Sequence, residues 1–178
     1  MNRISGFAAT MALCLATVLP AAAEPANLLG VFGNWSAYTT GTGSSLTCFA
    51  TSKPRATRPV IAKRGATFLM VSDWPSRKVK SEPQIIFGYQ AKEGAPAALG
   101  VGSDKFNFFI RNNGKEGSAW LQKLGENDRL VTAMQEGVSA VATGSMSVGK
   151  KLTKTSDTYS LAGFNDAMVK VHAACDVQ

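Results

Sequence analysis

An alternation of apolar and polar side chains over residues 138–148 constrains the fold of this chain more than any other feature of its sequence. A period of two is typical of an extended strand, in which successive side chains point to opposite faces. The pattern therefore predicts a half-buried strand with one face on the core and one in water. The core-side residues are mostly small, which predicts close packing against a bulky neighbour. They are Val138, Ala140, Ala142, Gly144, Met146 and Val148.

Shorter strand patterns recur along the chain. Two of them, residues 34–39 and 46–51, flank a Gly/Ser/Thr-rich turn and predict a first hairpin. Asn113-Gly114 predicts a second hairpin, because both residues tolerate positive φ in a type I′ turn. The remaining candidate strands are residues 67–73, 84–90, 105–111 and 118–122.

Two segments have helical periodicity instead. Residues 128–136 begin with Asp128, a candidate N-cap, and are followed by Gly137. Residues 163–174 carry an apolar stripe made of Phe164, Ala167, Met168, Val171 and Cys175.

These patterns together predict a mainly β fold. We expect a single-domain β-sandwich or flattened barrel of about seven or more strands, with a short helix near 128–136 and a C-terminal helix near 163–174 that covers one open end. The most mobile parts are expected at residues 24–29, 53–66 and 148–156, where no strand or helix pattern stands out.

The first 23 residues have the features of a cleaved signal peptide. Arg3 precedes an uncharged apolar run at residues 7–19, and Pro20 and Ala21-Ala22-Ala23 follow. The run is shorter than the roughly 20 apolar residues that a membrane-spanning helix needs. An uncleaved anchor and a lipid-modified Cys14 are the alternatives. Cleavage near Ala23 would leave one domain, residues 24–178, in the periplasm or on the outer surface, or secreted, with no transmembrane segment.

Cleavage would also reduce the three cysteines to two, Cys48 and Cys175. Two cysteines in an exported chain predict one intramolecular disulfide, with two free thiols as the alternative. Two cysteines and the single histidine are a poor ligand set for a metal, so we expect no metal and no cofactor.

Positive charge is concentrated in the segment from Lys53 to Lys80, where Asp73 is the only acidic residue. A basic segment of this kind attracts anionic partners, and in an exported protein these are lipopolysaccharide, acidic glycans and envelope or host-surface proteins rather than nucleic acid. A solvated loop is the alternative interpretation. We expect a monomer whose binding residues are Lys53, Arg55, Arg58, Lys63, Arg64, Arg77, Lys78 and Lys80.

The sequence offers few catalytic residues. His172 is the only histidine and is expected at the surface, where Asp176 would orient it. No G-x-S-x-G or H-E-x-x-H motif occurs. We therefore expect no catalytic residues and no enzymatic activity. The aromatic residues would form a sugar-stacking platform if exposed, although aromatic residues in strands are more often part of the core: Trp35, Trp74, Trp120, Tyr38, Tyr89 and Tyr159.

Several short segments, in order, resemble the invasion-associated locus B family of exported alphaproteobacterial proteins. They are CFATSKP at 48–54, Gly88-Tyr89, Val101-Gly102 with Phe106, Ala119-Trp120, Ala133-Met134 with Gly137, Gly144, and DTYSLAGF at 157–164 before Cys175. Many members have Gly-x-Ser-x-Arg-Gly-Thr where this chain has GSMSVGK at 144–150, so the arginine of that loop is missing here.

The resemblance implies an exported, β-rich protein named for a role in host-cell invasion, with no established activity or catalytic residues to transfer. Our first hypothesis is a non-catalytic periplasmic or envelope binding or host-interaction protein that engages an anionic surface, glycan or envelope protein. The alternatives are an unrecognised cell-envelope hydrolase that uses His172 or an acid pair, and a purely structural or stress-protective envelope protein. The structural alternative predicts no pocket with convergent polar groups.

Overall fold

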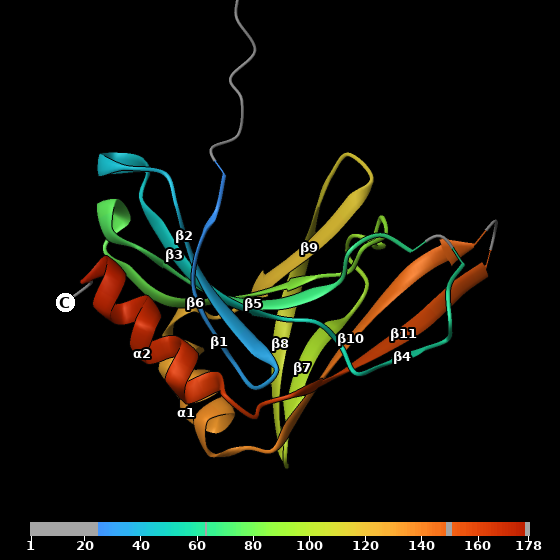
Figure 1. The fold of residues 1–178 in the computed structure, drawn as a ribbon. Coiled ribbons are helices and arrows are strands. Elements are labelled where there is room, and N and C mark those ends of the chain that lie inside the picture. The colour runs from blue at the N-terminus through green and yellow to red at the C-terminus, as the bar shows by residue number, and fades with distance from the viewer. Residues whose placement is uncertain (1–24, 63, 149–150, 177–178) are drawn as a thin grey trace, which may run out of the picture.

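Eleven antiparallel strands form one continuous sheet in the computed structural model, which describes residues 25–62, 64–148 and 151–176 (Figure 1). The strand order is β1-β2-β3-β5-β6-β9-β8-β7-β10-β11-β4. The strands are β1 (Asn27–Phe32), β2 (Trp35–Thr40), β3 (Thr47–Ser52), β4 (Ala56–Arg58), β5 (Phe68–Trp74), β6 (Val79–Ile86), β7 (Ala97–Val101), β8 (Asp104–Asn113), β9 (Glu116–Leu121), β10 (Ser139–Val148) and β11 (Lys151–Ser160).

The mainly β class is confirmed, and so are both helices. The helices are α1 (Asn127–Glu136) and α2 (Phe164–Cys175). Asp128 lies in the first turn of α1, whereas the N-cap position belongs to Glu126. All strands belong to one bent sheet with β1 and β4 at its edges, so the expected two layers are two parts of the same sheet. No helix in the described ranges is both long and apolar enough to cross a membrane.

The strongest sequence patterns correspond to the best-defined elements. The alternation becomes β10, with Ala140 and Ala142 fully buried, whereas Val138, predicted on the core side, precedes the strand and is 86% exposed. A Cβ added at Gly144 would approach the Phe87 ring to 2.7 Å. Phe87 is therefore the bulky neighbour, and the absence of a side chain at Gly144 allows its ring to pack this closely. The first hairpin is β2–β3. The second is β8–β9, although Asn113 pairs with Glu116 and the turn is displaced by one residue.

α2 packs on the half of the sheet that contains β1, β2, β3 and β5 (Figure 1). The predicted apolar stripe is confirmed: Phe164, Ala167, Met168, Val171 and Cys175 are all buried. Cys175 forms the predicted disulfide with Cys48 of β3, with 5.9 Å between their Cα atoms. The stripe and the cross-link therefore hold the same helix on the same strands.

Three segments expected to be mobile contribute strands instead. Residues 24–29 include the start of β1, residues 53–66 include β4, and residues 148–156 include half of β11. β11 pairs with β10 along its whole length and with β4 on its other side. Residues 149–150 and the predicted signal peptide at 1–23 lie outside the described residues.

Candidate functional site: a basic pocket on the open face of the sheet

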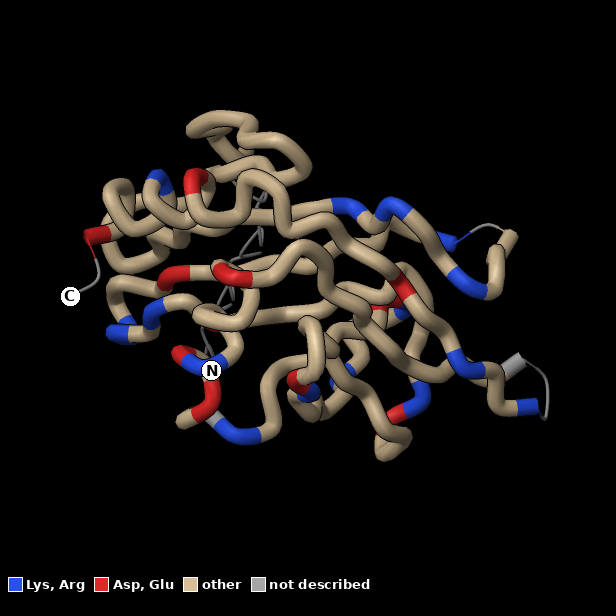
Figure 2. Tube along the Cα trace, turned by 90° about the horizontal axis from the view of Figure 1, so that it is seen from below, with Lys and Arg blue, Asp and Glu red and all other residues tan. Residues whose placement is uncertain are grey.

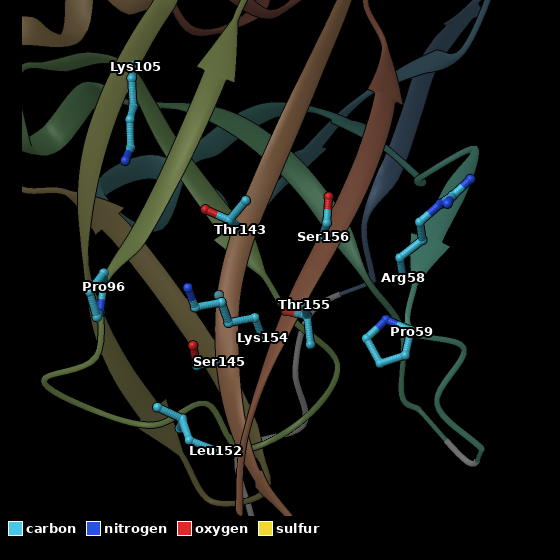
Figure 3. A pocket seen from close by; sticks show the side chains of 11 residues that line it. Arg58, Pro59, Pro96, Lys105, Thr143, Ser145, Leu152, Lys154, Thr155 and Ser156 are labelled. Carbon is cyan, nitrogen blue, oxygen red and sulfur yellow. The ribbon is translucent and has the colours of Figure 1, made fainter.

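A pocket with a volume of about 710 Å³ lies over β10, β11 and β4 (Figure 3). Three cationic side chains line it: Arg58 of β4, Lys105 of β8 and Lys154 of β11. The hydroxyl side chains of Thr143 and Ser145 of β10 and Ser156 of β11 lie between them, and Thr155 of β11 also lines the pocket although its own hydroxyl is buried against Tyr89. Pro59, Pro96, Gly144 and Leu152 complete the lining. The lining contains donors of hydrogen bonds and positive charge, and no carboxylate.

Strand register explains how distant residues meet here. Ala98 of β7 lies opposite Thr143, Thr143 opposite Ser156, and Ser156 opposite Arg58. Residues directly opposite each other share a face of a sheet, so this row faces away from the core residues Ala142 and Asp157. Exposed Lys154 is two residues from Ser156 and points the same way.

The three cations have no anionic partner within the described ranges. Neither Arg58, Lys105 nor Lys154 takes part in any ion pair there, and all three are exposed. Uncompensated charges of one sign raise the local concentration of counter-ions and anionic ligands. Figure 2 shows Lys and Arg positions gathered at the end of the molecule that carries β4 and β11. This arrangement is suited to binding phosphate, sulfate or carboxylate groups.

The structure divides the predicted basic segment into parts. Arg58 lines the pocket, and exposed Lys53 and Arg55 line a separate hollow of about 480 Å³ next to β2 and β3. Arg77, Lys78 and Lys80 lie around the β5–β6 turn, at the opposite end of the molecule from β4 (Figure 1). Arg77 stacks there on Trp74, 4.0 Å from the ring centroid. Lys63 lies outside the described residues.

Arg64 is occupied within the protein. Its guanidinium binds both oxygens of buried Asp157, at 2.7 and 2.6 Å, and its Nε donates to the Phe87 carbonyl at 2.7 Å. The same group lies 5.0 Å from the centroid of the Tyr89 ring. With only 8% of its side chain exposed, Arg64 supports the fold and adds nothing to the open basic surface.

A hydrogen bond joins this buried cluster to the pocket wall. The Tyr89 and Thr155 hydroxyls are 2.5 Å apart, and Thr155 also lines the pocket. Burial raises the pKa of Tyr89, which keeps the phenol neutral. The Arg64–Asp157 pair does not face the pocket. It holds in place β11, the strand that carries both Asp157 and the pocket residue Lys154.

His172 is placed differently from the expectation. Its Nδ1 lies 2.8 Å from Oδ2 of Asp73, and its side chain is only 30% exposed. Asp73 is fully buried and also accepts a hydrogen bond from the Ser81 amide. Asp176 was therefore the wrong partner. The sequence gives no sign of the pairing, because the two residues are 99 positions apart.

Two pocket residues were missed by the sequence analysis, Lys105 and Lys154. Lys105 belongs to a predicted strand and precedes the alternating buried residues Phe106 and Phe108, so the sequence pattern already indicated that its side chain is exposed. Its position beside Lys154 depends on the order β8-β7-β10-β11, which no local pattern encodes. Among the residues placed in the structure, no three His, Cys, Asp or Glu side chains gather as a metal-ligand set.

Comparison with known proteins gives a structural match. No protein-family model and no curated protein sequence matches the chain. Invasion associated protein b from Bartonella henselae is similar in structure, with a TM-score of 0.58 and 14% sequence identity over 83% of this chain and 97% of that chain. The similarity confirms the resemblance to invasion-associated locus B proteins at the level of the fold.

Proposed function

We propose that this chain is an exported envelope protein of the invasion-associated locus B type that binds an anionic partner and catalyses no reaction. The observation that carries the proposal is the convergence of Arg58, Lys105 and Lys154 on one open pocket lined by hydroxyl groups. Lys53 and Arg55, beside β4, extend the proposed binding surface.

An address outside the cytoplasm fits the Cys48–Cys175 disulfide. Thiols of cytosolic proteins are kept reduced, whereas exported proteins form stable disulfides. The similar Bartonella protein is named for invasion, and its name mentions no reaction. The disulfide supports an address in the periplasm, on the cell surface or outside the cell.

The purely structural alternative is less well supported. It predicts no pocket with convergent polar groups, and the pocket over β10 and β11 is such a feature.

The hydrolase alternative gains one observation, the Asp73–His172 pair, since a carboxylate that orients an imidazole is one part of many hydrolytic sites. However, the hydrogen bonds found between described residues connect His172 to no serine or cysteine nucleophile. If His172→Ala left every hydrolytic activity of the protein intact, the histidine-based alternative would fail.

The first test of the proposal is charge reversal in the pocket. Lys105→Glu with Lys154→Glu should abolish retention of residues 24–178 on immobilised heparin at moderate salt, because the change removes two cations and introduces two anions. Retention is measured by elution in a salt gradient, since binding driven by exposed charges weakens as salt screens them.

The matched control is Lys115→Glu with Lys170→Glu. These lysines are equally exposed and lie on the β8–β9 turn and on α2, away from the pocket. The control changes net charge by the same amount. Equal loss of retention in both double variants would mean that overall charge, not the pocket, attracts the anion, and the proposal would be abandoned. A further pair, Lys53→Glu with Arg55→Glu, measures the contribution of the neighbouring hollow.

A further inference from the structure

A pair of aromatic side chains lies on the same open face of the sheet as the basic pocket. Phe109 of β8 is directly opposite Trp120 of β9, and their rings stack with centroids 6.1 Å apart. Their neighbours on each strand, Phe108 and Leu121, point into the core. Phe109 is 40% exposed and Trp120 is partly exposed. The pair therefore presents flat apolar surface to solvent, of the kind on which a ligand ring can stack.

Polar groups surround this aromatic pair. A hollow of about 320 Å³ is lined by Glu82, Arg111 and Asn127 together with the two rings. The Asn127 Oδ1 atom is buried and has no hydrogen-bond partner within the described ranges, a costly state for an acceptor. The Arg111 guanidinium lies over one face of the Phe109 ring, 5.6 Å from its centroid. The site thus offers flat apolar faces, the Glu82 carboxylate as an acceptor and the Arg111 guanidinium as a donor in one place.

The aromatic hollow and the basic pocket are joined by a third hollow of about 390 Å³. That hollow shares Phe109 and Arg111 with the aromatic one and Pro96 with the basic one. Asn107 lines it and lies on β8 between Lys105 and Phe109, on the same face as both. The three hollows form one row over β9, β8, β7, β10, β11 and β4.

The chemistry changes along the row. The β9 end has two aromatic rings, the carboxylate of Glu82 and one cation, Arg111, whereas the basic pocket has hydroxyl groups and three cations that form no ion pair with a described residue. Six neighbouring strands at about 4.8 Å spacing extend over roughly 24 Å, longer than a single small anion requires. A simple polyanion would pair with the cations and make no use of the aromatic rings. A chain of sugar rings bearing acidic groups would use both ends, because its C–H faces stack on the aromatic rings, its hydroxyls bond to the Glu82 carboxylate and its acidic groups pair with the cations.

We propose that the row from Trp120 to Arg58 binds a linear acidic polysaccharide. The proposal rests on the function proposed above and names the class of its anionic partner. The sugar rings stack on Phe109 and Trp120, and the carboxylate or sulfate groups pair with Lys105, Lys154 and Arg58.

The experiment is calorimetric titration of residues 24–178 with four probes. Hexagalacturonate and a heparin hexasaccharide carry carboxylate and sulfate on sugar rings, maltohexaose is a neutral chain, and inorganic polyphosphate is a polyanion without rings. Phe109→Ala and Trp120→Ala should each weaken binding of an acidic oligosaccharide by roughly tenfold and leave polyphosphate binding unchanged. Lys105→Glu with Lys154→Glu should weaken both classes. Leu28→Ala, an exposed apolar residue on β1, is the control and should change nothing.

The outcomes separate the two proposals. If the aromatic variants leave binding of both acidic oligosaccharides unchanged while the lysine variant abolishes it, the partner is a polyanion recognised by charge alone, and the polysaccharide inference is wrong. The same conclusion follows if only polyphosphate binds. If the lysine variant changes the binding of no probe, the anionic function itself fails. Phe109 is the more exposed of the two rings, so Phe109→Ala keeps the test valid even if Trp120→Ala does not fold.

Discussion

At the scale of single residues, a buried cluster sits between the halves of the bent sheet. Arg64, from the segment between β4 and β5, binds Asp157 of β11, and both side chains are buried. Removing one member of such a pair leaves an uncompensated charge in the interior, which destabilises proteins by about 3–5 kcal/mol. Charge reversal at Arg64 would therefore unfold the protein rather than report on ligand binding. Charge reversal is therefore informative only at exposed cations such as Lys105 and Lys154.

Tyr159 gives the cluster a dependence on pH. Burial, and next the Asp157 carboxylate, raise the pKa of Tyr159 far above its ordinary value of 10.0. A raised pKa in the folded state means that the neutral phenol adds stability below pH 10, and that this stability is lost as pH rises beyond the unfolded-state value.

Tyr159→Phe removes this group and tests the argument. The Tyr159 hydroxyl is buried with no hydrogen-bond partner in the described part of the chain, so at pH 7 the free energy of unfolding should change by less than about 1 kcal/mol. Above pH 10 the variant should lose less stability than the parent protein. Urea unfolding at pH 7 and pH 10.5 measures both, with Tyr38→Phe as a control for a half-exposed tyrosine. Parallel losses in variant and parent would contradict the assignment.

At the scale of elements, the turn into α2 depends on a glycine. Gly163 has φ of +90°, and a Cβ placed there would collide with the Phe32 carbonyl at the end of β1. The neighbouring Ala162 carbonyl accepts a hydrogen bond from the Asn34 amide, at 3.0 Å. The turn before α2 is therefore packed directly against the turn between β1 and β2. This contact explains why the DTYSLAGF segment contains glycine immediately before its phenylalanine.

Gly163→Ala should lower the free energy of unfolding by about 1–3 kcal/mol or more, because positive φ and a backbone collision act together. Gly102→Ala is the matched control, since Gly102 has φ of +56° with open space around it. Thermal unfolding of both variants separates the two effects. If both substitutions lower the free energy of unfolding by the same amount, the contact with Phe32 contributes nothing.

Elements with a strong local period were predictable, and those held by distant partners were not. β10 and α2 each bury one regular stripe, so their periodicity was visible in the sequence. β11 was missed because its inward residues include Thr155 and Asp157, polar groups that become buried only through Tyr89 and Arg64. The lining of the basic pocket was only partly visible in the sequence for the same reason: Arg58 lies in a basic segment, whereas Lys105 and Lys154 join it only through the strand order.

At the scale of the whole molecule, the disulfide closes a loop of 127 residues and fastens α2 to β3. Cross-linking over that length reduces the entropy of the unfolded chain, a contribution of up to roughly 5 kcal/mol in the chain-entropy model. Cys48→Ser with Cys175→Ser should lower the free energy of unfolding by an amount in this range. Urea unfolding with and without reductant measures the change.

The same variant should still bind heparin below its unfolding transition. α2 packs on β1, β2, β3 and β5, whereas the open-face row extends from β9 to β4. A digest of the parent protein without reductant must contain a peptide that links Cys48 to Cys175. Loss of binding in a folded variant would show that the two halves of the sheet depend on each other.

The strict alternation of β8 has a consequence for divergence among proteins with this fold. Phe106, Phe108 and Ile110 carry the packing constraint, while Lys105, Asn107 and Phe109 between them contact few core atoms and face outward. Selection can therefore replace every outward residue without disturbing the scaffold. Two proteins at 14% identity can therefore share this fold while the outward positions of their strands differ.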